Sequence, residues 1–444
     1  MRWGISASIV GCAVALLPAL ALAQTEPMLP VPTVPVAPNI PVGVPLERGL
    51  TVVDRPRPEV DALGLRWGDF FFFPRAEVDE LYNDNISAGT GGPGSPKTND
   101  FITALAPSFD VRSNLPTNAV NLRAGAVISR YASHSNFDTE DAFADADGRL
   151  DVDHTHDFRG ALRVARLHED PGVPLVPGNA SQPVKYTTYS GTAGFEQTRL
   201  RIGYSADLTA ARTEYEAVPI LGGGLAPQSD RNNTAYELAL RGSYEFVPNY
   251  QGYVRGAVNH REYDHAAIGA PIRTSSGFRV DTGIRVDLTG ITYVEFFVGY
   301  LQQMYQATSL GTVRGPDVGA NAVWNPTQLT SVSLKAVRTI VDSPASIGAS
   351  TAPAYFASNV GLNVDHELLR NLLLNGHATF ENDDFKGVNR SDNDYLLGVG
   401  AKYLLMRNFY AGANYTHERR NSSGTAAINA FTRNIYMLRL STQL

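Results

Sequence analysis

The chain has 444 residues, 37 basic and 44 acidic side chains, a formal net charge of −7 and one cysteine. A mildly acidic chain without a basic run gives no electrostatic basis for nucleic-acid binding. Because the cysteine, Cys12, lies in the apolar N-terminal segment, the sequence beyond it can form neither a disulfide nor a cysteine-based zinc site.

Residues 1–23 have the features of a secretory signal peptide. Arg2 supplies a positive charge, residues 5–22 are mostly apolar, and Ala21-Leu22-Ala23 is an Ala-x-Ala cleavage site. The sequence Ile9-Val10-Gly11-Cys12 resembles a lipoprotein site, but the apolar run before it is too short for that signal. The prediction is therefore a mature chain that begins at Gln24. No second apolar run of about 18 residues follows, so no helical span is expected.

Residues 24–62 are predicted to be a Pro-rich periplasmic linker. Prolines recur every few residues from Pro27 to Pro45, and Asp54-Arg55-Pro56-Arg57-Pro58 adds a second patch. Such a sequence favours an extended, semi-rigid spacer without a core of its own. Two interpretations remain open: a disordered lead-in, or a docking arm for a periplasmic partner.

From residue 63 to residue 444 the sequence predicts one barrel domain, because hydrophobicity alternates with a period of two. In residues 278–288, for example, Phe278, Ile284 and Leu288 share one face and Arg279 and Asp287 share the other. Such segments have the length of a tilted membrane-crossing strand. The predicted strands are 70–82, 100–112, 119–132, 141–153, 158–168, 184–197, 199–212, 233–246, 250–263, 276–288, 291–306, 316–325, 328–340, 354–365, 372–382, 392–404, 408–418 and 430–444.

The connections between these strands alternate between long and short. Long loops such as 83–99 and 213–232 alternate with tight turns such as Val247-Pro248-Asn249, which is typical of outer-membrane barrels with periplasmic turns and external loops. The predicted fold class is all-β, a transmembrane antiparallel up-and-down barrel of about 18 strands, with 16 as the alternative. The predicted location is the Gram-negative outer membrane, with both termini periplasmic. The last strand, which ends at Leu444, would be recognised by the barrel assembly machinery.

The charged face of the strands is predicted to line a water-filled lumen, because the apolar face must meet lipid. Both signs of charge are present, so two interpretations stay open. The side chains either pair and solvate the wall, or they contact a polar or anionic solute through Arg forks. The candidates are Arg123, Asp145, Arg149, Arg159, Arg163, Arg199, Arg201, Asp207, Glu237, Arg241, Arg255, Arg279, Asp281, Arg285, Asp287 and Lys335.

No constellation in the sequence predicts an enzyme, a cofactor or a metal site. His154 and His156 could approach a metal, but no third ligand is evident, so a solvated turn is favoured. The acidic residues at 383–384 and 392–394 could hold calcium, but a hydrated loop is favoured. Hydrolase, zincin and phosphate-loop motifs are absent from the sequence.

One stretch of about two dozen residues carries a specific resemblance. It runs through Leu63-Gly64-Leu65-Arg66-Trp67-Gly68-Asp69-Phe70, then Phe72-Phe73-Pro74 and Glu77-Val78, to Tyr82-Asn83-Asp84-Asn85-Ile86. This stretch resembles the start of the outer-membrane β-barrel porin family of proteobacteria that is associated with exopolysaccharide export loci. Its members open with a Pro-rich arm, a glycine turn and an aromatic first strand. Leu444 stands where outer-membrane barrels usually end on an aromatic residue.

The resemblance implies a conduit for a secreted polysaccharide, with a periplasmic export protein as partner. A passive diffusion porin for small polar solutes is the alternative, and a structural or adhesive surface barrel is the second alternative. Diffusion porins usually carry a long inward-folded loop, and the outer loops here are not expected to form one. Outer-membrane lipid and lipopolysaccharide are further expected partners.

Overall fold

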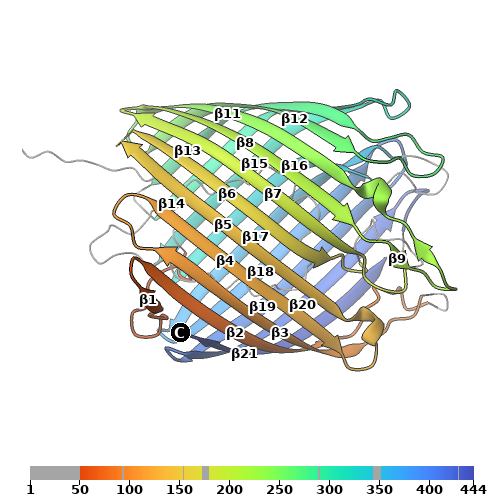
Figure 1. Cartoon of the computed structure of the whole chain (residues 1–444), viewed down its shortest axis with the longest axis horizontal. Helices are drawn as coiled ribbons and strands as arrows, with labels where there is room; N and C mark the ends of the chain where they lie inside the picture. The colour runs from red at the N-terminus through yellow and green to blue at the C-terminus, as the bar shows by residue number, and fades with distance from the viewer. Residues whose placement is uncertain are drawn as a thin grey trace, which may run out of the picture.

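The computed structural model describes residues 51–92, 95–153, 155–172, 180–288, 291–343, 352–428 and 430–444. Tilted strands lie side by side in one sheet that curves round into a closed barrel (Figure 1). Eighteen strands, β2–β8 and β11–β21, pair antiparallel with their neighbours, and β2 pairs with β21 to close the sheet. Closure satisfies the backbone hydrogen bonds that an open edge would leave unpaired in lipid.

The barrel strands are 13 to 16 residues long. Among the described residues, no helix is long and apolar enough to span a membrane. The barrel strands are β2 (Phe70–Asn83), β3 (Asp100–Ser113), β4 (Ala119–Tyr131), β5 (Thr139–Asp153), β6 (His156–His168), β7 (Lys185–Arg199), β8 (Ile202–Tyr215), β11 (Asn233–Val247), β12 (Tyr250–Tyr263), β13 (Ser275–Leu288), β14 (Thr292–Tyr305), β15 (Thr312–Thr327), β16 (Thr330–Asp342), β17 (Ala354–Leu369), β18 (Leu372–Phe385), β19 (Ser391–Met406), β20 (Phe409–Ser423) and β21 (Phe431–Gln443). Short elements are β1 (Leu65–Trp67), β9 (Val218–Pro219), β10 (Leu225–Ala226), η1 (Ser135–Phe137) and η2 (Ser229–Arg231).

Alternation along the strands gives the sheet one apolar and one polar face. On β13, Val280, Ile284 and Leu288 are exposed on one face. From the other face, Arg279 reaches Asp317 on β15 at 3.2 Å, across the intervening strand β14. Ion pairs between strands that are not neighbours form most readily on the concave side of a curved sheet. The charged face therefore lines the lumen, and the apolar face forms the outer surface.

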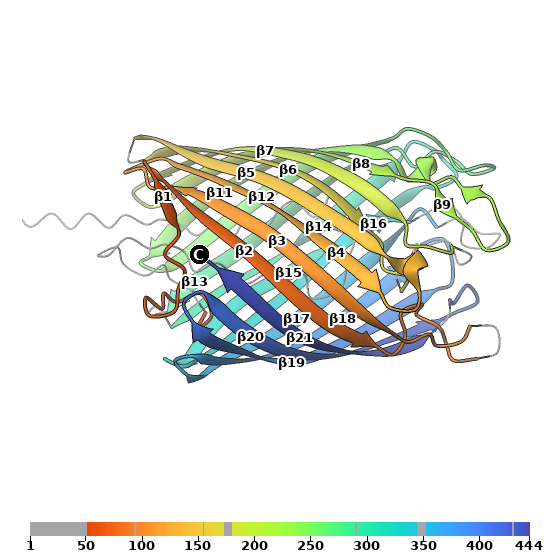
Figure 2. The same cartoon turned by 60° about the horizontal axis from the view of Figure 1, so that its bottom comes forward.

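The two ends of the barrel differ in their connections. At one end the strands are joined by short turns, such as Arg370-Asn371 between β17 and β18 and Arg407-Asn408 between β19 and β20. We call it the turn end, and the opposite end, which carries the long connections, the loop end. The C-terminus and β1 lie at the turn end (Figure 2).

The predicted fold class is confirmed, with 18 strands rather than 16. Each predicted strand range overlaps one barrel strand. The sequence did not predict β1, nor the short elements β9, β10 and η2 within the connection from β8 to β11. The predicted signal peptide, residues 1–23, and residues 24–50 of the predicted linker lie outside the described residues.

Candidate functional site: the lumen and its two mouths

A row of alternating charges crosses the lumen wall on β3 to β6. Asp110, Arg123, Asp145 and Arg163 are directly opposite one another in strand register. Asp145 lies 3.8 Å from Arg123 and 3.6 Å from Arg163. The Arg123 side chain is 56% exposed and that of Asp145 only 11%. The guanidinium group of Arg123 therefore extends into the lumen above the carboxylate.

The wall formed by β11 to β15 is more tightly paired. Arg255 contacts Asp281 at 2.9 Å, and its side chain is 13% exposed. Arg241 lies 3.3 Å from Glu295 and stacks at 3.7 Å on the ring of Tyr253. Cation–π stacking and ion pairing hold these guanidinium groups against the wall. The arginines of β3 to β6 thus protrude into the lumen further than those of β11 to β15.

Strand register places all but two of the sequence-predicted candidates on the lumen face. The charged residues there alternate with exposed apolar residues that point to the outer surface. The candidates on the lumen face are Arg123, Asp145, Arg149, Arg159, Arg163, Asp207, Glu237, Arg241, Arg255, Arg279, Asp281, Arg285, Asp287 and Lys335.

Arg199 and Arg201 require a correction. The predicted turn at Thr198 is in fact formed by Leu200 and Arg201, and Leu200 adopts a left-handed φ of 58°. Strand β7 therefore continues through Arg199, which pairs with Ile202 and shares its outward face. Arg201 lies exposed in the turn, outside the strands. A shift of the turn by two residues removed both side chains from the wall.

At the loop end, the connection after β6 folds inward against β20 and β21. Asp170 contacts Arg433 at 2.9 Å, and Arg433 also pairs with Glu418. The carbonyl of Gly172 accepts a hydrogen bond from Arg420. A side chain at Gly172 would meet the ring of Phe431, because a Cβ there would lie 2.8 Å from that ring. The glycine therefore permits the close approach of loop and wall.

The neighbouring residue Glu169 ties the same connection to η2. Both terminal nitrogens of the Arg231 guanidinium, Nη1 and Nη2, donate to the Glu169 carboxylate, and the guanidinium stacks at 3.9 Å on the ring of Tyr215. Burial opposes the charge on Arg231, but Tyr215 and Glu169 raise its pKa above the ordinary value. Burial also opposes the charge on Asp170, which for a carboxyl group means a higher pKa. The charge of Arg433 outweighs this effect and holds the pKa of Asp170 below its usual range. Both contacts are thus made between charged groups.

The end of β16 also contacts the inner wall at the loop end. Asp342 lies 3.0 Å from Arg261 on β12 and accepts hydrogen bonds from Tyr263 at 2.8 Å and Tyr305 at 2.6 Å. Arg273 donates to the carbonyl of Ser343 and to that of Asp230 next to Arg231. We call these contacts of Glu169, Asp170, Arg231, Arg273, Asp342 and Arg433 the loop-end network. Residues 169–172 thus contact the inner wall, a contact that the sequence did not predict.

At the turn end, residues 51–61 pack on the rim of the barrel, and we call them the arm. Val52 is fully buried, and its N–H donates to Ser331 Oγ on β16 at 2.7 Å. Arg57 pairs with Glu367 on β17 at 2.9 Å. Arg407 in the β19–β20 turn donates to the carbonyl of Pro58 at 2.7 Å. The arm therefore follows the rim from β16 towards β20.

The sequence analysis missed both mouths. Glu169 and Asp170 directly follow the histidine that ends β6. The local sequence does not indicate that their partners are Arg231 and Arg433, which are 62 and 263 residues away. The local signal within the arm was the pair of arginines in the Pro-rich patch at residues 54–58, which can donate to carboxylates and carbonyls of a neighbouring surface. Their partners are set by barrel closure and cannot be derived from local pattern.

Neither the histidine pair nor the acidic residues considered as metal ligands form part of an assembled metal site in the described part of the chain. No group of three or more His, Cys, Asp and Glu side chains is placed to hold a metal there. His154 lies outside the described residues, and His156 contacts Asp153 at 2.8 Å. The carboxylate of Asp392 is bound by Arg390 and that of Asp394 by Arg420.

A closed sheet of 18 strands, with an apolar outer surface and a charged lumen, defines a membrane-spanning β-barrel channel. The chain belongs to the family described as Putative beta-barrel porin 2, whose model matches residues 57–444. The protein is an outer-membrane porin, and the resemblance found in its first strand is confirmed. A search of curated proteins finds no match.

Solved structures with a similar arrangement include OpdQ of Pseudomonas aeruginosa, with 11% identity, a TM-score of 0.43, and coverage of 85% of this chain and 98% of that chain. OccK2 of the same organism, in complex with glucuronate, matches at 11% identity and a TM-score of 0.44, covering the same shares. The ferric citrate transporter FecA matches at 9% identity and a TM-score of 0.42, covering 84% of this chain and 78% of that chain.

Proposed function

We propose that this porin is the outer-membrane conduit of a secreted polysaccharide and receives it from a periplasmic export protein. In the orientation that goes with this proposal, the signal peptide directs export, the turn end is periplasmic and the loop end faces outward. The observation that supports the proposal most is the anchored arm. The Pro-rich run ends at Pro45, with only five residues between it and the arm, and the arm is fixed to the rim, so the run is covalently attached at the periplasmic mouth.

The chemistry of the lumen suits a hydroxyl-rich cargo. The row of Asp110, Arg123, Asp145 and Arg163 alternates acceptors and donors from strand to strand, about 4.8 Å apart. Sugar hydroxyls both donate and accept hydrogen bonds, so they match either kind of group. The separations of 3.6 and 3.8 Å around Asp145 exceed hydrogen-bond length, which leaves capacity for a solute.

A second candidate function is passive diffusion of small polar solutes. It is favoured by the loop-end network, because inward-folded loop segments narrow a mouth in the way that size-selective diffusion requires. The two functions predict different consequences for a growing cell. Export failure traps polymer in the periplasm, whereas loss of a diffusion porin slows uptake and leaves secretion unchanged.

The test compares a deletion strain carrying the full chain with one carrying a variant that lacks residues 27–50. This variant keeps the cleavage site and the arm. We expect both proteins to assemble as heat-modifiable barrels, and only the full chain to restore polysaccharide outside the cell. Polymer should accumulate in the periplasm with the shortened variant. Unchanged secretion in the deletion strain itself would overturn the export proposal and favour the diffusion porin.

A further inference from the structure

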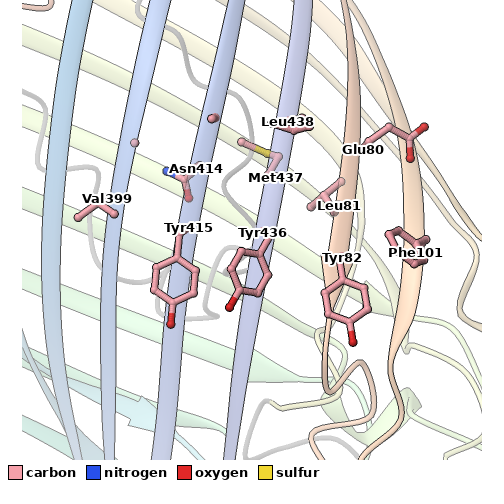
Figure 3. Close-up of a pocket in the computed structure, with 12 residues that line it drawn as sticks. Glu80, Leu81, Tyr82, Phe101, Val399, Asn414, Tyr415, Tyr436, Met437 and Leu438 are labelled. Carbon is pink, nitrogen blue, oxygen red and sulfur yellow. The ribbon is translucent and has the colours of Figure 1, made fainter.

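A groove of about 530 Å³ lies on the outer surface of the barrel, over the strands that meet where the sheet closes. It is lined by residues of β2, β3, β19, β20 and β21 (Figure 3), and most of its wall is apolar. Glu80 on β2 is the acidic residue of the lining, and its carboxylate accepts a hydrogen bond from Thr103 at 2.8 Å. Ala413 on β20 lies between the larger side chains of Leu438 and Tyr415, which accounts for the hollow. Because this surface faces lipid, an acyl chain is the chemical class that such a groove fits.

A row of four aromatic rings borders the groove on the side towards the loop end. Phe101 packs on Tyr82 at 5.0 Å, Tyr82 lies 6.3 Å from Tyr436, and Tyr436 packs on Tyr415 at 5.0 Å. The Tyr415 hydroxyl donates to Asn434 at 2.8 Å. Amphipathic aromatic rings of this kind mark the level where hydrocarbon gives way to headgroups. The groove therefore lies in the hydrocarbon just below that level.

Two cations lie above the aromatic row on the same outward face. Lys97 Nζ donates to Thr432 Oγ1 at 2.8 Å, and Thr432 is directly opposite Arg419 in the β20–β21 register. Thr432 is four residues beyond Tyr436, or about 13 Å along the strand. Both oxygens of the nearby Asp84 accept hydrogen bonds from Asn434 at 2.7 Å. Neither Lys97 nor Arg419 forms an ion pair with a carboxylate of the described residues.

Three outward-facing arginines near the loop end are neutralised within the protein, whereas Arg314 on β15, like Arg419, forms no ion pair with a carboxylate of the described residues. Arg130 pairs with Glu140, Arg166 with Glu216, and Arg212 with Asp264. Lys97 and Arg419 differ from Arg314 because both contact or lie opposite Thr432, so two cations without a carboxylate partner lie together on the strands that line the groove. From the groove towards the loop end, the outer surface presents an apolar hollow, then the aromatic row, then two cations. An anchored lipid presents its acyl chain, its interfacial region and its phosphate in the same order.

We propose that this surface is a specific site for a phosphorylated, acylated glycolipid of the outer leaflet. One acyl chain fills the groove, and a phosphate lies between Lys97 and Arg419. The site goes beyond the proposed function and uses only its orientation, in which the loop end faces outward. A second copy of the chain is a poorer occupant, because a two-fold interface here would bring like charges together. The bound lipid would cover the pairing of β2 with β21.

The test uses the full chain purified in detergent and native mass spectrometry with added lipid A, which carries two phosphates. The compared proteins are wild type, a Lys97→Gln/Arg419→Gln double variant, Ala413→Phe, and Arg166→Gln as a control. Arg166→Gln removes an outward charge that Glu216 already neutralises. Heat-modifiable migration shows that each variant is folded. Lipid A stripped of its phosphates is the matched control ligand.

We expect one lipid A to bind wild type and Arg166→Gln equally. The double variant should bind about 30-fold more weakly, since two basic residues near an anionic surface contribute about 1 kcal/mol each. Ala413→Phe should weaken binding with its charges intact, because the ring fills the groove. Equal affinity for the stripped lipid, or unchanged affinity of a folded double variant, would overturn the proposal. Dimers that lipid A dissociates would also overturn it, in favour of a self-association surface.

Discussion

Both mouths of the barrel carry chain that packs against the inner wall or rim, but different interactions hold it in place at each mouth. At the loop end the contacts are buried ion pairs, with Glu169 on Arg231 and Asp170 on Arg433. At the turn end the fully buried Val52 accompanies one half-buried ion pair, Arg57 with Glu367. The first mouth depends mainly on charge, and the second on apolar burial as well.

This difference matters because buried ion pairs are stable only when complete. Removal of one partner leaves a desolvated charge and costs about 3–5 kcal/mol. Burial of a valine side chain contributes about 1.5–3 kcal/mol and does not respond to pH or salt. We therefore expect the loop end to respond to charge substitutions and to acid, and the turn end to remain largely as it is.

The largest effect is expected for Glu169→Gln. Arg231 is buried, so loss of its carboxylate partner costs about 3–5 kcal/mol and favours separation of the connection after β6 from η2 by a factor of more than about 100. We expect a higher single-channel conductance in planar bilayers. The control is Glu216→Gln, which removes an exposed carboxylate paired with Arg166 on the outer surface. A folded Glu169→Gln barrel with wild-type conductance would show that this contact does not narrow the mouth.

Acid should have a smaller effect at the same mouth. Asp170 has a pKa held below its ordinary value by Arg433, so its contribution is present at neutral pH and is lost as pH falls through the depressed pKa. We expect conductance to rise below the ordinary aspartate range, about pH 3.9. The rise is limited because the carbonyl of Gly172 still accepts a hydrogen bond from Arg420 in acid. Asp170→Asn should flatten this acid-dependent rise, and a rise of the same size in that variant would assign it to other groups.

Most of the fold could be predicted from sequence because the membrane imposes a simple rule. A strand such as β13, exposed to lipid on one face and water on the other, must alternate, so periodicity and length gave nearly every strand. Turns were harder. Tyr204 and Leu208 gave the face of β8, but the turn before it was misplaced because Leu200, not a glycine or asparagine, adopts the left-handed conformation.

The lumen could be predicted only as a face and not as a set of contacts. Alternation identifies Arg123 and Arg255 as equivalent, yet one protrudes and the other is packed against Asp281. That distinction depends on which residues stand across the strands. The loop-end network is still harder to predict from the sequence, because Asp170 and Arg433 are brought together only by closure of the whole sheet. No local pattern encodes a contact across that distance.

The smallest effect is expected at the turn end, where the arm offers two ion pairs of contrasting burial. The Arg57 and Glu367 side chains are 11% and 18% exposed, whereas Arg370 and Glu59 are 81% and 67% exposed. Exposed pairs contribute little because water and salt screen them. Arg57→Gln should therefore loosen the arm by about 1–2 kcal/mol, as expected for a hydrogen-bonded charged group, and Arg370→Gln should not.

Hydrogen exchange of residues 51–61 in the folded barrel measures this difference directly, because exchange reports local opening. Faster exchange in Arg57→Gln, with exchange in Arg370→Gln like that of wild type, would place the anchoring of the arm in its half-buried contacts. Conductance should change little in either variant, since Val52 and its hydrogen bond to Ser331 remain. Equal exchange in all three proteins would mean that the arm is held by Val52 and the contact of Arg407 with Pro58 and not by its ion pairs, and the contrast between the two mouths would then be sharper still.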